Sequence, residues 1–418
     1  MLSTLYAESS QKNQKYRWYI LALVTASGTF VASIPFSCMP VLFEEISNDL
    51  GLTLVQIGTI WGLGSLAGIF VSIIAGVLSD WFGVKRILSV FSILVGITGA
   101  LRGISNSYTI LAMTVFINGI FRMIVPVTLT KTIGIWFKGE NLGLAIGISA
   151  MGMGLGLMLG PLISATILSP VLGGWRNVMY FYGAISIGMG ILWILFGREP
   201  YKSDSTSITS DTVPLRQAFS KLIHFKALWF IGLTLLLRQG CMIGMTGYLP
   251  LYLREQGWGV VSADGVLASY FAVSTVCVVP LSYLSDRIGS RKAILFPAIL
   301  ITMACVALIP VVEGSMIWIL MVCAGIFMDS FMSVVVTMLM ETQGLKMIHA
   351  GTAIGIVFSI ANIGIATSPP IGNSLASINP GAPFYFWSFL AFLALLPVAL
   401  AKETGRRGMN LAKEGKKA

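Results

Sequence analysis

Long apolar runs, separated by short polar stretches, make up most of this chain. Each run holds close to 20 residues or more. At about 1.5 Å per residue, a helix of that length crosses the roughly 30 Å hydrocarbon core of a bilayer. The pattern therefore predicts twelve membrane-spanning helices, with approximate limits 18–43, 54–79, 87–104, 108–137, 142–169, 177–197, 226–253, 263–284, 293–312, 316–340, 350–376 and 384–401.

The longest polar stretch divides the predicted helices into two groups of six. It is rich in Ser and Thr and carries several basic residues, a composition typical of a linker. We expect five segments along the chain: a polar N-terminal segment (1–17), a first bundle (18–197), a cytoplasmic linker (198–225), a second bundle (226–401) and a basic tail (402–418).

Composition agrees with this membrane interpretation and excludes several other classes. Hydrophobic residues make up 56% of the chain and charged residues 11%, whereas soluble domains carry about 25% charged residues. The five cysteines lie in apolar runs and the two histidines are far apart, so we expect no metal site and no cofactor. With no phosphate loop and no clustered catalytic set, the sequence does not indicate an enzyme.

The formal net charge of +10 reports membrane topology rather than a nucleic-acid partner. If both termini lie on one side, that side holds 21 of the 27 Lys and Arg residues, and the opposite side holds only Arg102, Arg176 and Arg254. Basic loops stay on the cytoplasmic face of membrane proteins. We therefore expect cytoplasmic termini in the cell membrane, lipid as the surroundings, no nucleic acid, and a chain that acts as a monomer.

Two motifs recur in both halves at nearly the same separation. The stretch GVLSDWFGVKR (76–86) is similar to SYLSDRIGSRK (282–292), with its Asp, Gly and basic pair offset by 206 positions. A second pattern, offset by 208 positions, relates the fifth and eleventh spans: Gly147, Gly156, Gly160 and Pro161 correspond to Gly355, Gly364, Ser368 and Pro369. Such repeats predict an all-α polytopic protein of two six-helix bundles related by a pseudo-two-fold axis along the membrane normal.

The first of these stretches resembles the loop motif of the major facilitator superfamily, usually written G-x-L-[AS]-D-x-x-G-x-[RK]-[RK]. The resemblance implies a secondary transporter with a central cavity walled by spans one, four, seven and ten, and alternating access by rocking. Trp81 departs from the pattern, since many members have a basic residue there. The resemblance also implies a latch on the cytoplasmic face, with candidate gate residues Gly76, Asp80, Gly83, Lys85, Arg86, Asp286, Gly289 and Arg291; a plain basic loop is the alternative.

The fifth span, GISAMGMGLGLMLGP (147–161), resembles a motif associated with exchangers in that superfamily, notably drug/proton antiporters. Ser164 and Ala165 replace its final glycines. Small residues with a proline also suit tight packing at a kinked helix. Exchange and simple helix packing through Gly147, Gly156, Gly160 and Pro161 therefore stay open as alternatives.

Charges well inside the spans are few: Arg122 and Lys131 in span four, Arg238 in span seven and Asp329 in span ten. Buried charges in membranes pair with one another or face a polar cavity. Arg122 and Arg238 lie deep, and we expect them to bind substrate. Lys131 is close enough to the cytoplasmic end to extend to water instead, so it is either a substrate ligand or an anchor.

The repeat places Arg122 and Asp329 at equivalent positions, 207 residues apart. One hypothesis is a gating pair between them, direct or through substrate; the alternative is two unrelated charges bonded locally. Asp329 and Glu341, near the end of span ten, are candidates for a proton that binds and leaves, since burial favours the neutral carboxyl form.

The balance of three cations against one anion favours a small anionic solute, either an organic carboxylate or an inorganic oxyanion. An unpaired buried cation is costly, and a bound anion relieves that cost. Transport could be proton-coupled or proceed by exchange. The alternative function is drug/proton efflux, which a negative cavity would suit better.

Overall fold

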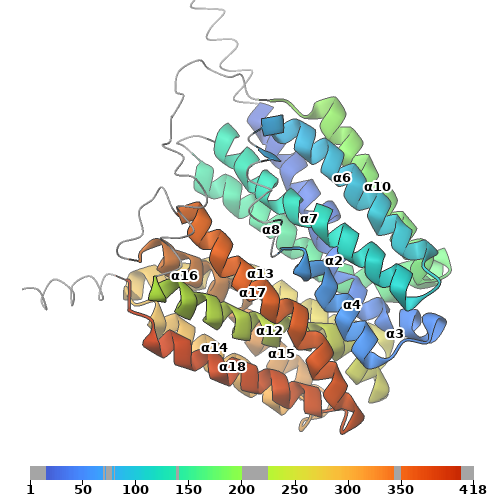
Figure 1. Cartoon of the computed structure of the whole chain (residues 1–418), viewed down its shortest axis with the longest axis vertical. Helices are drawn as coiled ribbons and strands as arrows, with labels where there is room; N and C mark the ends of the chain where they lie inside the picture. Colours follow the sequence, from blue (N-terminus) through green and yellow to red (C-terminus); the bar gives the residue numbers. More distant parts are fainter. Residues whose placement is uncertain are drawn as a thin grey trace, which may run out of the picture.

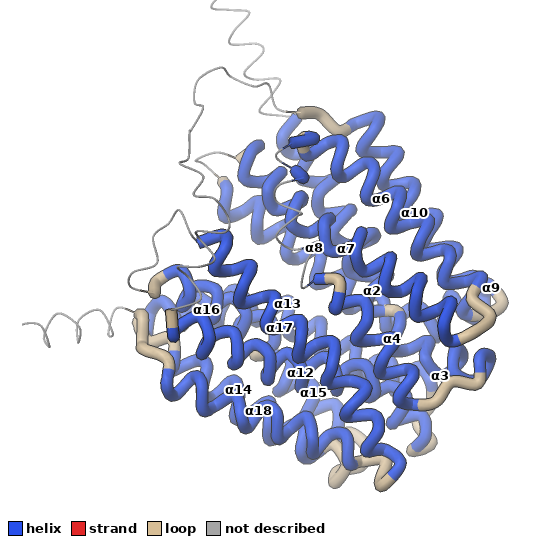
Figure 2. Tube along the Cα trace, in the orientation of Figure 1, coloured by secondary structure: helices blue, strands red, loops and turns tan. Residues whose placement is uncertain are grey.

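Long helices form the described part of this chain, as Figure 2 shows for the computed structural model. It describes residues 16–68, 71, 78, 79, 81–137, 141–199, 225–342 and 350–405, and no strand occurs among them. The predicted linker lies almost entirely outside these ranges, as do most of the tail and the gate residues Gly76 and Asp80.

The first half of the chain begins at Tyr16 with a helix that continues to Ser37. This helix contains the π-helical turn η1 (Gly28–Ser33) and the short α2 (Ile34–Ser37). The remaining elements of this half are α3 (Met39–Leu50), α4 (Leu54–Leu66), α6 (Val84–Leu101), η2 (Arg102–Ile104), α7 (Tyr108–Trp136), α8 (Leu142–Ile163), η3 (Ser164–Leu168), α9 (Ser169–Leu172) and α10 (Trp175–Phe196).

The second half repeats this plan. Its elements are α12 (Lys226–Glu255), α13 (Val260–Ile288), α14 (Lys292–Leu308), α15 (Met316–Ile326), α16 (Met328–Met340), α17 (Ala350–Ser374), η5 (Leu375–Ser377) and α18 (Ala382–Leu400). The predicted tenth span corresponds to α15 and α16, which are separated only at Phe327.

Each of the twelve predicted spans overlaps an apolar helix among the described residues. Within the described residues, ten helices are long and apolar enough to cross a membrane. The predicted second and ninth spans correspond to the shorter apolar helices Leu54–Leu66 and Lys292–Leu308. The predicted class, an all-helical polytopic membrane protein, is confirmed.

The helices group into two halves that meet along a few elements. Figure 1 shows the first-half helices, blue to green, on one side and the second-half helices, yellow to red, on the other. Across the boundary α4 packs on α17, α8 on α13 and α3 on α12. In these contacts the second span packs on the eleventh, and the fifth packs on the eighth. The second and eighth spans occupy equivalent positions in the two halves, as do the fifth and eleventh, so a two-fold repeat relates the two contacts.

The helices run between two ends of the molecule, called here the linker end and the far end. The linker end carries Tyr16, Phe196, Lys226 and Leu400, where the hydroxyl of Tyr16 donates to the carbonyl of Phe196. The far end carries the turns that follow Leu50 and Leu101. On the far-end part of α4, a Cβ atom at Gly62 would lie 2.3 Å from the carbonyl oxygen of Ala366 in α17. The absence of a side chain there lets the two halves touch backbone to backbone.

Helix packing accounts for two glycines of the fifth-span motif. A Cβ atom at Gly156 would lie 2.6 Å from the Cβ of Ser33, and one at Gly160 would lie 2.1 Å from the Oγ of Ser37. Thr29 also donates from Oγ1 to the carbonyl of Gly152 at 2.7 Å. Nothing lies within 4 Å of a Cβ atom built at Gly147. Gly156 and Gly160 thus allow α8 to pack closely against the first span, whereas Gly147 makes no such contact.

Candidate functional site

Arg122 lies at the middle of α7, 14 residues from Tyr108, or about 21 Å from the far end of that helix. Its side chain is half-buried, and its guanidinium carbon lies 4.5 Å from the ring centroid of Phe36. Within the described residues this guanidinium makes no hydrogen bond or ion pair. An aromatic face attracts a cation but does not neutralise it, so the charge of Arg122 stays uncompensated.

Arg102, predicted to lie on the side opposite the termini, is the first residue of η2, and only 4% of it is exposed. Its burial was not predicted. Its Nη2 donates to Asn118 Oδ1 at 2.6 Å, and its Nη1 donates to the carbonyl of Pro35 at 3.4 Å. The side chain therefore folds back from the end of α6 into the first bundle. Asn118, a lone amide within the fourth apolar run, was the signal that could have located it, since a buried amide requires a partner.

Arg102, Asn118 and Arg122 line one small cavity together with Phe36 and Trp61. Its volume is about 20 Å³, enough for about one water molecule. The rings of Phe36 and Trp61 stack with centroids 4.6 Å apart and an interplanar angle of 19°. No described carboxylate forms an ion pair with either arginine. We call these five residues the two-arginine pocket.

Arg238 lies inside the second bundle. It is fully buried, its Nη2 lies 3.4 Å from Thr302 Oγ1 in α14, and its guanidinium lies 4.9 Å from the ring centroid of Phe331 in α16. Its Nε and Nη1 have no partner in the described structure. Arg238 thus lies among α12, α14 and α16 and does not line the two-arginine pocket.

Asp329 is the first acidic residue of α16. Its Oδ2 accepts a hydrogen bond from Ser274 Oγ in α13 at 2.6 Å, and the backbone N–H of Asp329 donates to Ser274 Oγ at 3.1 Å. Neither Arg122 nor Arg238 forms an ion pair with it among the described residues. The direct Arg122–Asp329 pair is therefore not formed in this conformation, and the two charges are held by different halves.

Glu341 lies outside the cavity region, at the linker end of the second half. Its carboxylate accepts two hydrogen bonds from Arg291, from Nε at 3.0 Å and from Nη2 at 2.6 Å. Arg291 also donates from Nη1 to Asp286 Oδ1 at 2.6 Å. The bidentate bond to Glu341, aided by Asp286, raises the pKa of Arg291 above its ordinary value. Asp286, Gly289 and Arg291 of the second gate motif therefore bond within their own half.

The two halves repeat one further feature at this end, which the sequence analysis missed. Glu199 Oε1 accepts from the backbone N–H of Lys85 at 2.7 Å, at the start of α6. Glu403 accepts from the backbone N–H of Arg291 at 2.8 Å, at the start of α14. A carboxylate at a helix N-terminus is favourable because it accepts unpaired N–H groups and opposes the helix dipole. Gly83, with φ +81°, precedes α6 and would place a Cβ atom 2.5 Å from Glu199.

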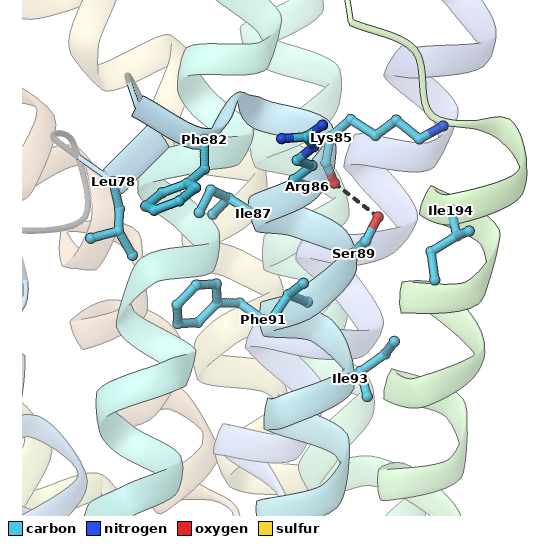
Figure 3. A pocket seen from close by; sticks show the side chains of 10 residues that line it. Leu78, Phe82, Lys85, Arg86, Ile87, Ser89, Phe91, Ile93 and Ile194 are labelled. Atoms are coloured by element: carbon cyan, nitrogen blue, oxygen red, sulfur yellow. Dashed lines mark hydrogen bonds between the residues drawn. The ribbon is translucent and has the colours of Figure 1, made fainter.

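Lys131, Lys85 and Arg86, the remaining predicted residues near the linker end, lie apart from the two-arginine pocket. Lys131 is half-buried on α7, five residues before its end at Trp136. Lys85 and Arg86 border a largely apolar hollow of about 510 Å³, which Figure 3 shows beside Phe82, Phe91 and Ile194. Because Phe82 and Ile194 are themselves exposed, this hollow opens on the outer surface of the first bundle.

The two halves are tied together by polar contacts at the far end. Trp61 Nε1 donates to the carbonyl of Ile243 at 2.8 Å, and Asn373 Nδ2 donates to the carbonyl of Leu54 at 2.8 Å. Arg254 of α12 pairs with Glu44 of α3 at 2.9 Å. At the linker end, Lys85 bonds to Glu199 and Arg291 bonds to Glu341 and Asp286, each within its own half. The far end is thus held closed by bonds between the halves.

Arg254 joins two carboxylates. Besides Glu44, it pairs through Nη2 with Asp264 Oδ1 at 2.6 Å, and Asp264 is fully buried. The arginine side chain is 6% exposed and Glu44 is 45% exposed. Arg254 is therefore fixed to its own half by a buried acid and to the other half by a partly exposed one.

Comparison with known proteins gives a consistent result. The sequence profile of the Major Facilitator Superfamily matches residues 25–343 and 260–417. A probable nitrate/nitrite antiporter, NarK1 of Thermus thermophilus, is 24% identical over 68% of this chain and 64% of its own length, slightly under two thirds. The nitrite extrusion protein of Bacillus subtilis is 25% identical over 86% of each chain. A multidrug resistance efflux pump, PmrA of Streptococcus pneumoniae, is 24% identical over 70% of this chain and 72% of its own.

The fold is also known from solved structures. A bacterial homologue of the human lysosomal transporter Spinster, in an inward-facing and unoccupied conformation, superposes with a TM-score of 0.75. The match covers 92% of this chain and 95% of that one, at 18% identity. Identity this low shows a shared fold and does not extend to the solute.

Proposed function

We propose that this chain, which belongs to the major facilitator superfamily, carries a small anion across the membrane. The family predicted from the two loop motifs is confirmed, and with it the expectation of a transporter rather than an enzyme. The class of solute is our proposal: an inorganic oxyanion or a small carboxylate.

One observation carries this proposal. Arg122 lies at the middle of a membrane helix and is half-buried; its guanidinium lies over an aromatic ring and pairs with no carboxylate among the described residues. A cation at that depth costs roughly 2.5–3.5 kcal/mol even on insertion scales. An anion bound to its planar fork removes that cost and gains charge-assisted hydrogen bonds. Relatives named for nitrate and nitrite support the same solute class.

The direction in which the cavity opens follows from topology. The charge distribution indicates that the linker end faces the cytoplasm. With the far end closed by Trp61, Arg254 and Asn373, this conformation is the inward-facing one. Outward opening requires these contacts to break, and the two gate motifs to close the cytoplasmic side. Asp80 and Asp286 are the proposed latch groups in that opposite state.

The other predicted charges receive distinct proposed roles. Arg238 and Lys131 are the further cations of the predicted substrate set; neither lines the two-arginine pocket in this conformation. Asp329, held by Ser274, is the proposed proton-coupling group. Glu341 is proposed as a gating residue because its bonds to Arg291 join the end of α16 to the start of α14. Proton symport and anion exchange are both compatible with this arrangement.

Drug/proton antiport is the second candidate, favoured by the fifth-span motif and by the efflux-pump relative. Its substrates include lipophilic cations, which the uncompensated arginines would repel. The glycines of the motif that pack closely, Gly156 and Gly160, are accounted for by the contact of α8 with the first span.

The test is a panel of solutes added to the purified full-length protein in detergent. Thermal unfolding is followed with nitrate, nitrite, acetate, tetraphenylphosphonium and ethidium, in the wild type, in Arg122→Gln and in Arg287→Gln, which removes an exposed arginine instead. We expect an anion to stabilise the wild type and Arg287→Gln but not Arg122→Gln. Stabilisation by the two cations that survives Arg122→Gln would overturn the anion proposal in favour of drug efflux.

A further inference from the structure

We infer that Arg102 is the second cation of the anion site, and that Trp61 closes this site toward the far end. The inference rests on the proposed function and adds to it a binding residue and the chemistry of the ligand. The ligand is a small planar oxyanion, such as nitrate or a carboxylate group; the cavity, which holds about one water molecule in this conformation, widens to admit it.

Arg102 carries a charge that its described partners do not neutralise. A guanidinium has five N–H donors and no acceptor, and Arg102 makes two hydrogen bonds, both to neutral oxygens. Its Nε is buried and has no partner in the described structure. Removing a charge from water without a counter-charge is strongly unfavourable. Since no described carboxylate pairs with Arg102, a ligand anion is the natural source of compensation.

Asn118 holds the guanidinium of Arg102 in place. Asn118 donates from Nδ2 to the carbonyl of Val95 at 3.0 Å and to Thr98 Oγ1 at 2.9 Å. These bonds leave its Oδ1 free to accept from Arg102. The amide therefore fixes the guanidinium beside the cavity and does not neutralise it. Such a preorganised donor lowers the cost of ordering the site when a ligand binds.

The two-arginine pocket suits a planar anion in both shape and charge. Arg102 and Arg122 line the same cavity, so each raises the electrostatic cost of the other. The stacked rings of Phe36 and Trp61 form an apolar wall. Two planar forks and a flat wall suit a flat anion, since guanidinium groups bind such oxyanions through paired hydrogen bonds.

Trp61 connects this pocket with the closed end of the transporter. It lies seven residues from Leu54, or about 10 Å from the far end of α4, whereas Arg122 is about 21 Å deep. Its indole is bonded to Ile243 of the other half, and a Cβ atom at Gly247 would lie 2.4 Å from its ring. Separation of the halves at the far end removes both contacts. The same movement that opens the transporter outward therefore releases the wall of the pocket.

The test measures the shift in unfolding temperature that sodium nitrate causes, with sodium chloride at matched ionic strength as the reference. The variants are Arg102→Gln, Arg102→Lys and Arg122→Gln, each compared with its own nitrate-free protein, so that a change in basal stability cancels. Arg102→Lys keeps the positive charge but loses the planar guanidinium group. It therefore separates bidentate recognition of the anion from a purely structural role. We expect the apparent nitrate affinity to fall at least tenfold in both glutamine variants and by an intermediate factor in Arg102→Lys.

The outcomes separate the two proposals. If Arg122→Gln loses the nitrate shift while both Arg102 variants keep wild-type affinity, Arg102 is no ligand and only the anion proposal stands. If neither nitrate, nitrite nor acetate shifts the wild type, the anion proposal fails and this inference fails with it. If Arg102→Gln does not fold, Arg102→Lys alone decides, because unchanged affinity in that variant contradicts bidentate recognition.

Discussion

Arg254 of the second half and Glu44 of the first half form an ion pair of 2.9 Å at the far end of the molecule. This pair joins the halves directly, whereas the bond of Arg254 to Asp264 stays within one half. We therefore expect Glu44→Gln to weaken the closed far end without disturbing the buried pair.

The effect is measurable as a change in distance between the halves. Spin labels at positions 104 and 311, both exposed at the far end, report on its opening. A partly exposed pair contributes up to about 1 kcal/mol, or roughly a fivefold change in the open population. Asp49→Asn is the matched control, because it removes the Arg176–Asp49 pair, which lies within the first half. Equal distance distributions in Glu44→Gln and the wild type would contradict the role of the Arg254–Glu44 pair in holding the far end closed.

The glycines of the fifth-span motif should differ in their tolerance of alanine. Gly156→Ala places a methyl group against Ser33 and the carbonyl of Thr29 and should destabilise the protein by about 1–3 kcal/mol. Gly147→Ala meets nothing within 4 Å and gains helix propensity. Thermal unfolding of both variants checks this, and equal losses of stability would refute the packing role of Gly156.

The carboxylate at the start of α14 gives the second half a dependence on pH. Burial would raise the pKa of Glu403, but hydrogen bonds from Ser290 and from backbone N–H groups hold it below its ordinary 4.5. A depressed pKa means that the carboxylate stabilises the fold fully above pH 4.5 and loses this effect as pH falls through the lower folded value.

The variant Glu403→Gln should therefore unfold at a lower temperature than the wild type at pH 7, with a difference that shrinks below pH 4.5. Glu313→Gln, at an exposed position, is the control and should show little difference at either pH. A gap between Glu403→Gln and the wild type that stays constant from pH 7 to pH 4 would disprove the assigned role.

Asp329 should link solute movement to protons. We expect Asp329→Asn to abolish accumulation of the anion driven by a pH gradient while retaining exchange of anion for anion, since the amide cannot take up a proton. Ser282→Ala is the control: it breaks the Ser282–Ser333 bond between the same two helices, α13 and α16. Uptake in proteoliposomes with and without a pH gradient distinguishes the two modes. Full gradient-driven accumulation by Asp329→Asn would exclude this residue as the coupling site.

Hydrophobic run lengths and the repeated motifs were sufficient to predict the helices, their grouping into two halves and the family. These features are local or periodic, so the order of residues encodes them directly. The position of Arg122 near the middle of α7 follows from the same reasoning, since counting residues along a helix locates a side chain along the helix axis.

What the sequence could not give are contacts made by long side chains between distant segments. Arg102 stands at the end of an apolar run, and its backbone position agrees with either a loop or a buried side chain. Glu341 binds Arg291, 50 residues away, and no pattern along the chain marks that pair. Contacts such as Trp61–Ile243 also depend on which conformation the protein occupies.

Anion exchange in proteoliposomes tests the central claim most directly. Vesicles containing the purified protein are loaded with nitrate and given external nitrite, and the nitrite that enters is assayed for the wild type, Arg122→Gln and Arg287→Gln; a parallel set uses acetate. The account predicts exchange of at least one anion by the wild type and Arg287→Gln, and a rate at least tenfold lower for Arg122→Gln. Anion exchange that persists at the wild-type rate in Arg122→Gln would contradict it.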